Sequence, residues 1–304
     1  MPITDTPAVF SGYPRADYDQ LKGWNSSLLK VALSKTPAHA YNAFLAPDRG
    51  PSKDSAAFRI GTLVHEALLE PEVWSRIISC SSGSTTKAFS QAVSDAAVKG
   101  QKVAQASEYD LAAAMSAAVF EHPVLAQLFA PTPENVALNE LTLVWPDPTT
   151  GQQCKARLDA VRVTDDEILI LDLKTTADAS ASEFGRSAAS YLYLLQATFY
   201  ADGLFYCARA LEKLLGFPEG RLIGRPVTFE FVAIEKSETP HQVARYRLTA
   251  DQAAMGRRLY RHALDLVTTA SDLDYWPGYD TGPAPLELPN WAWTNMESLI
   301  SSTN

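Results

Sequence analysis

The stretch "EILILDLKTT", residues Glu167 to Thr176, decides the fold because it combines a strand with two charged side chains. Its four consecutive aliphatic residues, Ile168 to Leu171, are typical of a strand that is buried on both faces. Asp172 and Lys174 follow, and a period-2 strand places their side chains on the same face. Burying either charge without a partner is costly. The pattern therefore predicts a salt bridge between them, or a site where a further charged group lies beside them.

Two more strands precede this stretch and one follows it. "LNELTLVW" (Leu138–Trp145) alternates as a strand, and the turn "PDPTTG" separates it from a second strand, "QQCKARLDAVRV". The turn "TDD" leads into the stretch above, so the spacing predicts a three-stranded antiparallel meander. A long helix from about Arg186 to Leu215 is expected next, followed by a strand, "PVTFEFVAIE".

The rest of the chain is mainly helical in pattern. Caps, breakers and alanine-rich runs predict helices and connections in the following places: Trp24–Leu45 with Asn25 or Ser26 as N-cap and a stop before Pro37, Ser55–Leu69 ended by Glu70–Pro71, a loop at Ser79–Thr86, one or two helices closing at Pro123, a helix at about Ala250–Thr269, and an irregular, packed Pro- and Trp-rich strap in the tail. We therefore expect a mixed α/β fold with a central mixed sheet flanked by helices. The expected organisation is one domain, 1–304, with a helical N-terminal region (1–54), a core (55–270) and a C-terminal strap (271–304).

Composition limits the class of protein. The chain has 304 residues, of which 46% are hydrophobic and 20% charged, which is typical of a soluble globular protein. Its apolar runs are shorter than the roughly 20 residues of a membrane span, and the N-terminus lacks the layout of a signal peptide. The three cysteines (Cys80, Cys154 and Cys207) are too widely spaced for a disulfide framework or a metal knuckle. We expect reduced thiols in a cytoplasmic protein that does not bind membranes.

Charge is distributed unevenly along the chain, whose formal net charge is −9. Residues 134–183 hold ten acidic and four basic residues, whereas residues 221–262 hold eight basic and four acidic ones. Two solvated surfaces would explain this distribution. An acidic cation site beside a basic surface that binds a polyanion would explain it equally well.

Asp159 provides a partner for Asp172. The hairpin between their strands is centred at Asp165 and Asp166, so residues equidistant from it, such as Asp159 and Asp172, face each other. Two close carboxylates repel, and one is expected to protonate unless a cation lies between them. Mg²⁺ suits this position because it prefers oxygen ligands and retains waters for a phosphate. Lys174 would then orient the attacking water or stabilise the charge that develops on the phosphate.

Other polar residues have both a structural and a functional interpretation. His65 lies in a predicted helix one turn after Gly61, which would leave space above the ring, but a lone helical histidine is usually structural. Gln196 and Tyr200 share a helix face, and such pairs usually belong to a buried amphipathic helix. Arg157 would either contact a phosphate or pair with a neighbouring acid, and the sequence supports the two interpretations equally.

The ordered set of motifs resembles a known family. The motifs are G-x-x-x-H (Gly61 to His65), R-x-D (Arg157 to Asp159), D-x-K-T-T (Asp172 to Thr176) and Q-x-x-x-Y (Gln196 to Tyr200). Together they resemble the RecB-type branch of the PD-(D/E)XK nucleases, whose core is that of the restriction endonucleases. "RIGTLVHEALLEPEVW", "ELTLVWPDPTTGQQCKARLDAV" and "YLYLLQATFYADGL" narrow the resemblance to RecE-type exonucleases (exodeoxyribonuclease VIII), from about Tyr13 to Ala270.

This resemblance implies a Mg²⁺-dependent exonuclease, with Mn²⁺ as a substitute, that digests duplex DNA ends from 5′ to 3′. Such enzymes leave 3′ single strands for an annealing protein in phage or prophage recombination, and they assemble as ring-shaped homo-oligomers in bacterial or phage-infected cells. This chain lacks the long N-terminal region of RecE and the cysteines of the iron–sulfur members, so no cluster is expected.

The resemblance also implies roles for individual residues. They are His65, Asp159, Asp172 and the Leu173 carbonyl as metal ligands, Lys174 as the catalytic lysine, Gln196 and Tyr200 as residues that hold the substrate strand or order the site, Arg157 as a DNA contact, and Glu140 as a weaker candidate for the site. Two alternatives remain. One is a non-catalytic module that binds DNA ends on the same fold, and the other is a related nuclease that acts on single strands or flaps.

Overall fold

The computed structural model of the chain describes residues 6–45, 55–129, 136–237, 239–279, 282–283 and 285–301. At its centre is a sheet of six strands: β1 (Ala8–Phe10), β4 (Val136–Pro146), β5 (Gln153–Val163), β6 (Ile168–Thr176), β7 (Val227–Glu235) and β8 (Val243–Arg247). The strands lie side by side in this same order. All neighbours are antiparallel except β6 and β7, which are parallel. The predicted meander and the mixed sheet are confirmed.

The predicted register of the β5–β6 hairpin is also confirmed. Ala160 pairs with Leu171, and the ladder continues to Val163 and Ile168. This is the register that places Asp159 level with Asp172. β1 and β8 are additional edge strands that the sequence analysis missed. Both are short, and neither is more than partly buried over most of its length.

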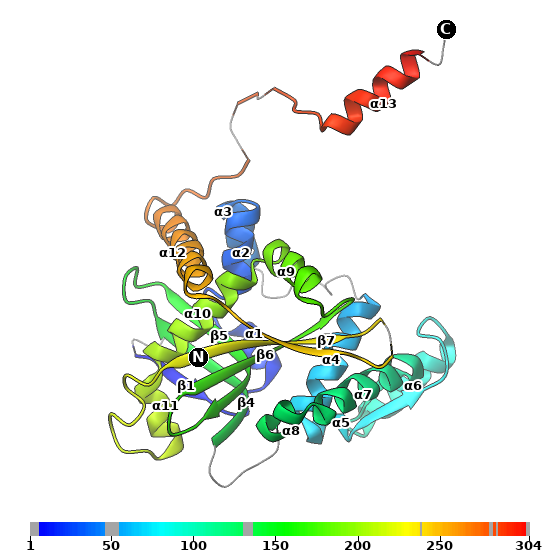
Figure 1. The fold of residues 1–304 in the computed structure, drawn as a ribbon, viewed down its shortest axis with the longest axis vertical. Helices are drawn as coiled ribbons and strands as arrows, with labels where there is room; N and C mark the ends of the chain where they lie inside the picture. The colour runs from blue at the N-terminus through cyan, green and yellow to red at the C-terminus, as the bar shows by residue number, and fades with distance from the viewer. Residues whose placement is uncertain are drawn as a thin grey trace.

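Helices cover both faces of the sheet (Figure 1). On one face lie α2 (Ser26–Ser34), α10 (Tyr193–Tyr206) and α12 (Ala250–Asp272), whose apolar side chains share a core cluster with the sheet. On the other face lie α4 (Ala56–Leu69), α7 (Ala106–Glu121) and α8 (Pro123–Phe129), which form a second cluster with it. Because both faces are covered, β6 is buried along its aliphatic half, as its sequence predicts.

β4 and β5 share an irregularity at the centre of the sheet. In a regular strand, residues three positions apart point to opposite faces. Leu138 and Leu141 of β4 nevertheless both pack on the α10 side, and so do Leu158 and Val161 of β5. Each strand therefore changes, at the same level, the face to which its alternate residues point.

The prediction of one continuous helix from Arg186 to Leu215 is wrong. The structure has three helices there: α9 (Ala181–Ser190), α10 and α11 (Ala208–Leu215). Leu192, with φ 50° and ψ 48°, separates the first two, and Cys207 separates the last two. A left-handed residue cannot continue a right-handed helix. The apolar pattern runs through both breaks, so the sequence does not reveal them.

The N-terminal third contains the predicted helices, α6 (Lys87–Val98) among them, and a lobe whose two strands the sequence analysis did not predict. α1 (Arg15–Gln20), α2 and α3 (Pro37–Leu45) form the helical N-terminal region, and Asn25 caps α2 by accepting a hydrogen bond from the Leu28 N–H at 2.9 Å. The lobe follows α4 and consists of α5 (Pro71–Trp74), β2 (Ile77–Cys80), α6 and β3 (Lys102–Gln105). β2 and β3 pair in parallel, so the predicted loop at Ser79–Thr86 is wrong at its first two residues.

The tail is only partly the irregular strap that the sequence analysis expected. Trp276 packs on the body, with its ring stacked on Tyr41 at 4.0 Å between centroids. Beyond it, α13 (Asn290–Ser301) is a helix that stands away from the body, and Trp291 in it is 68% exposed (Figure 1). Among the described residues no single helix is long and apolar enough to cross a membrane. α7 and α8, bent by 100° relative to each other, meet the length and composition criteria as a pair.

Candidate functional site

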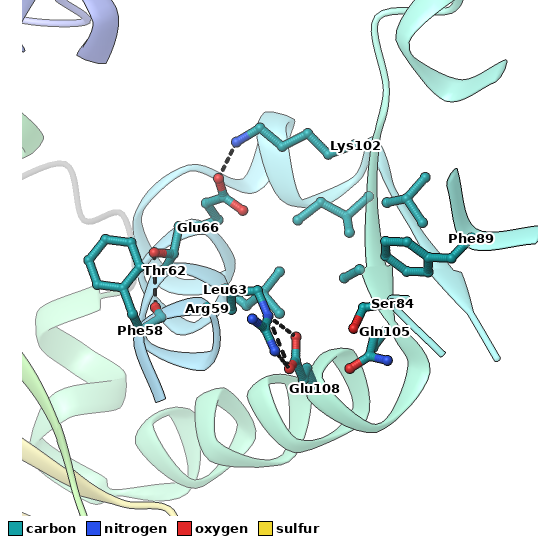
Figure 2. Close-up of a pocket in the computed structure, with 13 residues that line it drawn as sticks. Phe58, Arg59, Thr62, Leu63, Glu66, Ser84, Phe89, Lys102, Gln105 and Glu108 are labelled. Atoms are coloured by element: carbon teal, nitrogen blue, oxygen red, sulfur yellow. Dashed lines mark hydrogen bonds and ion pairs between the residues drawn. The ribbon is translucent and has the colours of Figure 1, made fainter. Parts of the chain in front are cut away.

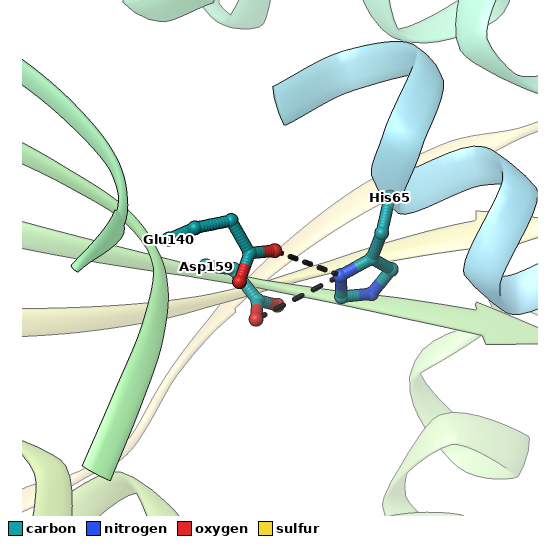
Figure 3. Close-up of side chains that lie close together, drawn as sticks. All are labelled: His65, Glu140 and Asp159. Carbon is teal, nitrogen blue, oxygen red and sulfur yellow. Dashed lines mark ion pairs between the residues drawn. The ribbon is translucent and has the colours of Figure 1, made fainter. Parts of the chain in front are cut away.

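Three potential metal ligands converge at the irregularity of β4 and β5. His65 of α4, Glu140 of β4 and Asp159 of β5 each offer a ligand atom, and these atoms lie within 4.8 Å of one another. The His65 Nδ1 atom is 3.7 Å from Asp159 Oδ1 and 4.0 Å from Glu140 Oε1 (Figure 3). The pairing of the strands skips Glu140 and Asp159, and Glu140 has a left-handed backbone, φ 51°. The irregularity is therefore what brings the two carboxylates to one point.

Helix α4 approaches the sheet closely enough for His65 to reach these carboxylates. Ser55 caps the helix by accepting a hydrogen bond from the Phe58 N–H at 3.2 Å. A Cβ atom on Gly61 would lie 3.4 Å from Oγ1 of Thr175 on β6. The sequence analysis assigned Gly61 to leave room above the His65 ring. In the structure this glycine faces β6, and an added Cβ would make an ordinary van der Waals contact with Thr175.

Arg157 holds Glu140 in place. Its Nε donates a hydrogen bond to Glu140 Oε2, and its Nη1 donates one to the Tyr13 carbonyl at 2.5 Å. Arg157 is only 9% exposed. Of the two interpretations of Arg157, the pairing with a neighbouring acid is the one that the structure contains.

Asp172 and Lys174 are in contact, as their common strand face predicts. Asp172 is 1% exposed, and its Oδ2 forms an ion pair with the Lys174 ammonium group. Its Oδ1 accepts a hydrogen bond from Gln196 Nε2 at 2.8 Å. Gln196 in turn accepts one from Lys30 Nζ at 3.0 Å. The predicted Gln196 therefore orients Asp172, and a second lysine joins the network.

Lys30 is the residue of this network that the sequence analysis missed. It lies on α2, and its ammonium nitrogen is 5.4 Å from the ring centroid of Tyr193, while that of Lys174 is 5.2 Å from the same centroid. Such distances are typical of cation–π contacts. A lysine among the apolar residues of "SSLLKVALS" is also typical of a surface helix, so no local signal identifies it.

Tyr200 lies one turn after Gln196 on α10 and is partly buried in the core cluster on this face. Its hydroxyl forms a hydrogen bond with Ser26 of α2, and burial raises its pKa above the usual value. The structure thus places Tyr200 beside the network rather than in contact with Asp172, with α2 as its partner.

The two halves of the site are linked through β6. Oδ2 of Asp159 accepts a hydrogen bond from the Leu173 N–H at 2.8 Å, and the His65 ring is hydrogen-bonded to the backbone of Leu173. Leu173 therefore contacts both His65 and Asp159, while its neighbours Asp172 and Lys174 lie on the other strand face. His65, Glu140, Asp159 and Leu173 lie together, and Asp172 lies next to them without joining the three ligands within 4.8 Å.

Burial and the mutual repulsion of the carboxylates shift the pKa values of the site residues. Burial and the neighbouring Asp172 raise the pKa of Asp159, and burial and Asp159 raise that of Glu140. Burial lowers the pKa of His65, which favours the neutral imidazole that binds metals. Burial also lowers the pKa of Lys174, but the charges of Asp172 and Asp159 outweigh it, and the net shift is upward.

The donor set fits a divalent cation. Two carboxylates and one imidazole, with a further buried carboxylate beside them, supply the oxygen and nitrogen ligands that Mg²⁺ or Mn²⁺ accept. His65, Glu140 and Asp159 are the residues that would hold the ion.

A large cavity lies elsewhere, on another side of α4, and none of the predicted site residues belongs to its lining. It has a volume of about 560 Å³ and is bounded by α4, β3 and the start of α7 (Figure 2). Glu108 accepts a hydrogen bond from Arg59 Nε at 2.9 Å, and Glu66 pairs with Lys102, so the charges that line the cavity are paired with one another.

Comparisons with known proteins bear on the fold and on the family. A crystal structure of a candidate exonuclease from Eubacterium rectale matches with a TM-score of 0.56 and 10% identity, over 91% of this chain and 94% of that one. Two further structures score too low to indicate a shared fold. Protein SSO0001 has a TM-score of 0.26 and 13% identity, over 69% of this chain and 85% of that one. Protein VC1899 from Vibrio cholerae has a TM-score of 0.23 and 11% identity, over 88% of this chain and 58% of that one. No curated protein matches the chain.

The match to the Eubacterium rectale structure is evidence for the fold alone, because the sequences are so different. A family model gives the firmer result. It is described as a PDDEXK-like domain of unknown function (DUF3799), and it matches residues 25–284. This range includes every residue predicted for the site, from His65 to Tyr200. The chain therefore belongs to this PDDEXK-like family, which confirms the fold class and the nuclease resemblance that its motifs predicted.

Proposed function

We propose that this protein is a Mg²⁺-dependent exonuclease that digests linear double-stranded DNA from the 5′ end and leaves 3′ single strands. The observation that carries the proposal is the meeting of His65, Glu140 and Asp159 beside the Asp172–Lys174 pair on one sheet. The PDDEXK-like fold supports nuclease chemistry. The substrate and the polarity rest on the resemblance to RecE-type exonucleases.

The residues of the site divide the work. A divalent ion held by His65, Glu140 and Asp159 would supply Lewis-acid activation of the phosphate and of the attacking water. Lys174 lies close enough to Asp159 for its charge to oppose the rise in that carboxyl's pKa, and from there it stabilises the charge that develops on the phosphate oxygens. Asp172, fixed by Gln196, holds the Lys174 ammonium group in place. Arg157 holds Glu140 beside His65 and Asp159, where it would bind such an ion.

The test is digestion of linear duplex DNA labelled at either the 5′ or the 3′ end. Wild-type protein is compared in Mg²⁺, Mn²⁺ and EDTA with Lys174→Ala, and a covalently closed circle serves as a substrate without ends. Lys99→Ala is the matched control, because Lys99 is an exposed lysine that follows α6. We expect rapid, metal-dependent release of the 5′ label that Lys174→Ala abolishes and Lys99→Ala leaves unchanged.

Other outcomes would change the proposal in defined ways. Prompt release of the 3′ label would reverse the polarity, and cleavage of single strands or flaps alone would change the substrate. Binding of duplex ends without release of either label would replace the enzyme with a non-catalytic DNA-end-binding module.

The resemblance also supports proposals on assembly and location. We propose a ring-shaped homo-oligomer, an annealing protein as partner, and activity in the cytoplasm of a bacterial or phage-infected cell. Light scattering coupled to gel filtration tests the first of these, and a monomer at micromolar concentration would contradict it.

A further inference from the structure

A second cavity, of about 470 Å³, lies between the C-terminal half of α10, the start of β7 and α12. Three arginines line it, Arg225, Arg257 and Arg261, together with one acid among the described residues, Asp202. The chain as a whole carries a net charge of −9, so this concentration of guanidinium groups stands out. All three arginines belong to the basic segment 221–262 that the sequence analysis identified.

The guanidinium groups are fixed in position before any ligand binds. Arg257 forms a two-point contact with Asp202, with Nε and Nη2 at 3.0 and 2.9 Å from its carboxylate oxygens. Arg261 donates from Nη1 to Asp147 at 2.8 Å and from Nη2 to the Tyr206 hydroxyl at 3.3 Å. Arg225 donates from Nη1 to the carbonyl of Thr164. Side chains that are already ordered lose less entropy on binding.

These contacts leave donors unused. A guanidinium group has five N–H donors. Within the described part of the chain, Nη1 of Arg257 and both Nε and Nη2 of Arg225 have no hydrogen-bond acceptor. Asp202 pairs with Arg257 and Asp147 pairs with Arg261, so among the described residues Arg225 is the arginine of the lining without a carboxylate partner. The cavity therefore suits an anion with several oxygens, and phosphate, like carboxylate, matches the forked geometry of arginine.

The position of the cavity connects it with the site described above. Gln196 and Tyr200 on α10 belong to that site, and Tyr206, near the end of the same helix, lines the cavity. At 1.5 Å per residue, Gln196 and Tyr206 are roughly 15 Å apart along the helix axis. This distance corresponds to about four nucleotides of one DNA strand at 3.4 Å each.

We propose that the arginine-lined cavity is a second phosphate-binding site, which takes a phosphate group of the DNA backbone or of a released mononucleotide. The proposal rests on the proposed function for the identity of the ligand. Phe205, which is 55% exposed, and Val227 provide apolar surface against which the sugar attached to that phosphate would pack.

The experiment measures binding in EDTA, where no cleavage occurs, with a fluorescent DNA duplex and separately with a 5′-mononucleotide as probes. Wild-type protein is compared with Arg225→Gln and with the double variant Arg225→Gln/Arg257→Gln. Arg209→Gln is the control, because the ion pair of Arg209 with Glu219 is solvent-exposed, with side chains 73% and 76% exposed. Circular dichroism and thermal melting verify that each variant is folded.

If the cavity binds the DNA backbone, the double variant should bind DNA about 10-fold more weakly than wild type. The slope of the logarithm of the binding constant against the logarithm of the salt concentration should also decrease in magnitude, by about one for each arginine replaced. A mononucleotide site predicts instead loss of mononucleotide binding with DNA binding unchanged. Arg225→Gln removes only one hydrogen bond to a carbonyl group, so it tests the site even if the double variant unfolds. If folded variants bind both probes as tightly as wild type does, the proposal is overturned.

These results are separable from the proposed function. A protein that binds DNA through these arginines but does not cleave it would contradict the exonuclease and leave the phosphate site intact. A protein that cleaves DNA normally and binds it independently of Arg225 and Arg257 would contradict only the phosphate site.

Discussion

Lys30 and Lys174, from a helix and a strand far apart in sequence, hold their ammonium groups against the same ring. Their Nζ atoms lie 5.4 and 5.2 Å from the centroid of Tyr193. Burial, and to a smaller extent the charge of Lys174, lower the pKa of Lys30 to about 8. Two neighbouring cations that repel each other, yet are held by Gln196, Asp172 and the ring, are suited to bind an anion between them.

Replacing Lys30 with Met should therefore slow DNA cleavage by about 100-fold, comparable to the loss of one donor that stabilises transition-state charge. Lys35→Met, at the exposed end of α2, should have no effect. Because the pKa of Lys30 is about 8, its charge is lost as pH rises past 8. Wild-type activity should fall above this pH, and Lys30→Arg should retain its activity there. Identical pH profiles for the two proteins would exclude Lys30 as the source of the fall.

Arg157 should control the affinity of the metal site without being a ligand. Arg157→Gln removes the hydrogen bond that orients Glu140, and loss of such supporting contacts typically weakens metal binding by about 10- to 100-fold. Titration calorimetry with Mn²⁺ in the absence of DNA measures this change. Arg186→Gln, which breaks an exposed pair with Glu183, is the control. Unchanged Mn²⁺ affinity in Arg157→Gln would show that Glu140 is not a ligand.

The metal-free protein should lose stability as pH rises, and added metal should oppose this loss. Folding raises the pKa of both Asp159 and Glu140, so the metal-free folded protein binds more protons than the unfolded chain does. Its stability should fall as pH rises from the ordinary carboxyl pKa, about 4, through the raised values. Mg²⁺ competes with these protons, so its stabilising effect should increase with pH. Thermal melting between pH 5 and 8, with Mg²⁺ and with EDTA, measures both trends; a pH-independent Mg²⁺ effect would contradict the assignment.

Gly256 on α12 should be essential for the packing that supports the site. A Cβ atom there would lie 2.8 Å from both the Leu194 carbonyl carbon and Thr198 Oγ1 on α10, the helix that carries Gln196. Gly256→Ala should therefore lower the free energy of unfolding by about 1–3 kcal/mol. Gly185→Ala, on α9 with no atom within 4 Å of the new Cβ, should be neutral or slightly stabilising. Chemical denaturation compares the two, and equal stabilities would refute the close-packing argument.

Local sequence signals predicted the centre of the fold well. Turn residues and alternation gave the three-stranded meander, and the hairpin centre gave its register, because both depend on residues close together in the chain. The edges of the sheet were harder. β1 and β8 are three and five residues long, and their side chains are mostly half-buried, so neither shows clear alternation. Their pairing is determined by the rest of the sheet.

The candidate site was predicted where its residues sit in motifs and missed where they meet only in space. Asp159, Asp172 and Lys174 lie on predicted neighbouring strands. Lys30 reaches the site because α2 packs over α10, a contact that no local pattern encodes. The irregularity did leave a trace in the sequence: Leu138 and Leu141, like Leu158 and Val161, are spaced by three where a regular strand requires two or four.

The irregularity of β4 and β5 differs from an ordinary β-bulge because it affects both strands at the same level. The pairing of β4 with β5 keeps its registration on both sides of Glu140 and Asp159, while the side chains of both strands change face together. Deleting one residue would restore regular alternation in one strand only. On one side of the deletion, the side chains of that strand would then point to the opposite face from those of its partner. Only the deletion of one residue from each strand, at the same level, would restore regular alternation in both. The packing around the irregularity therefore keeps Glu140 and Asp159 together in the middle of the sheet.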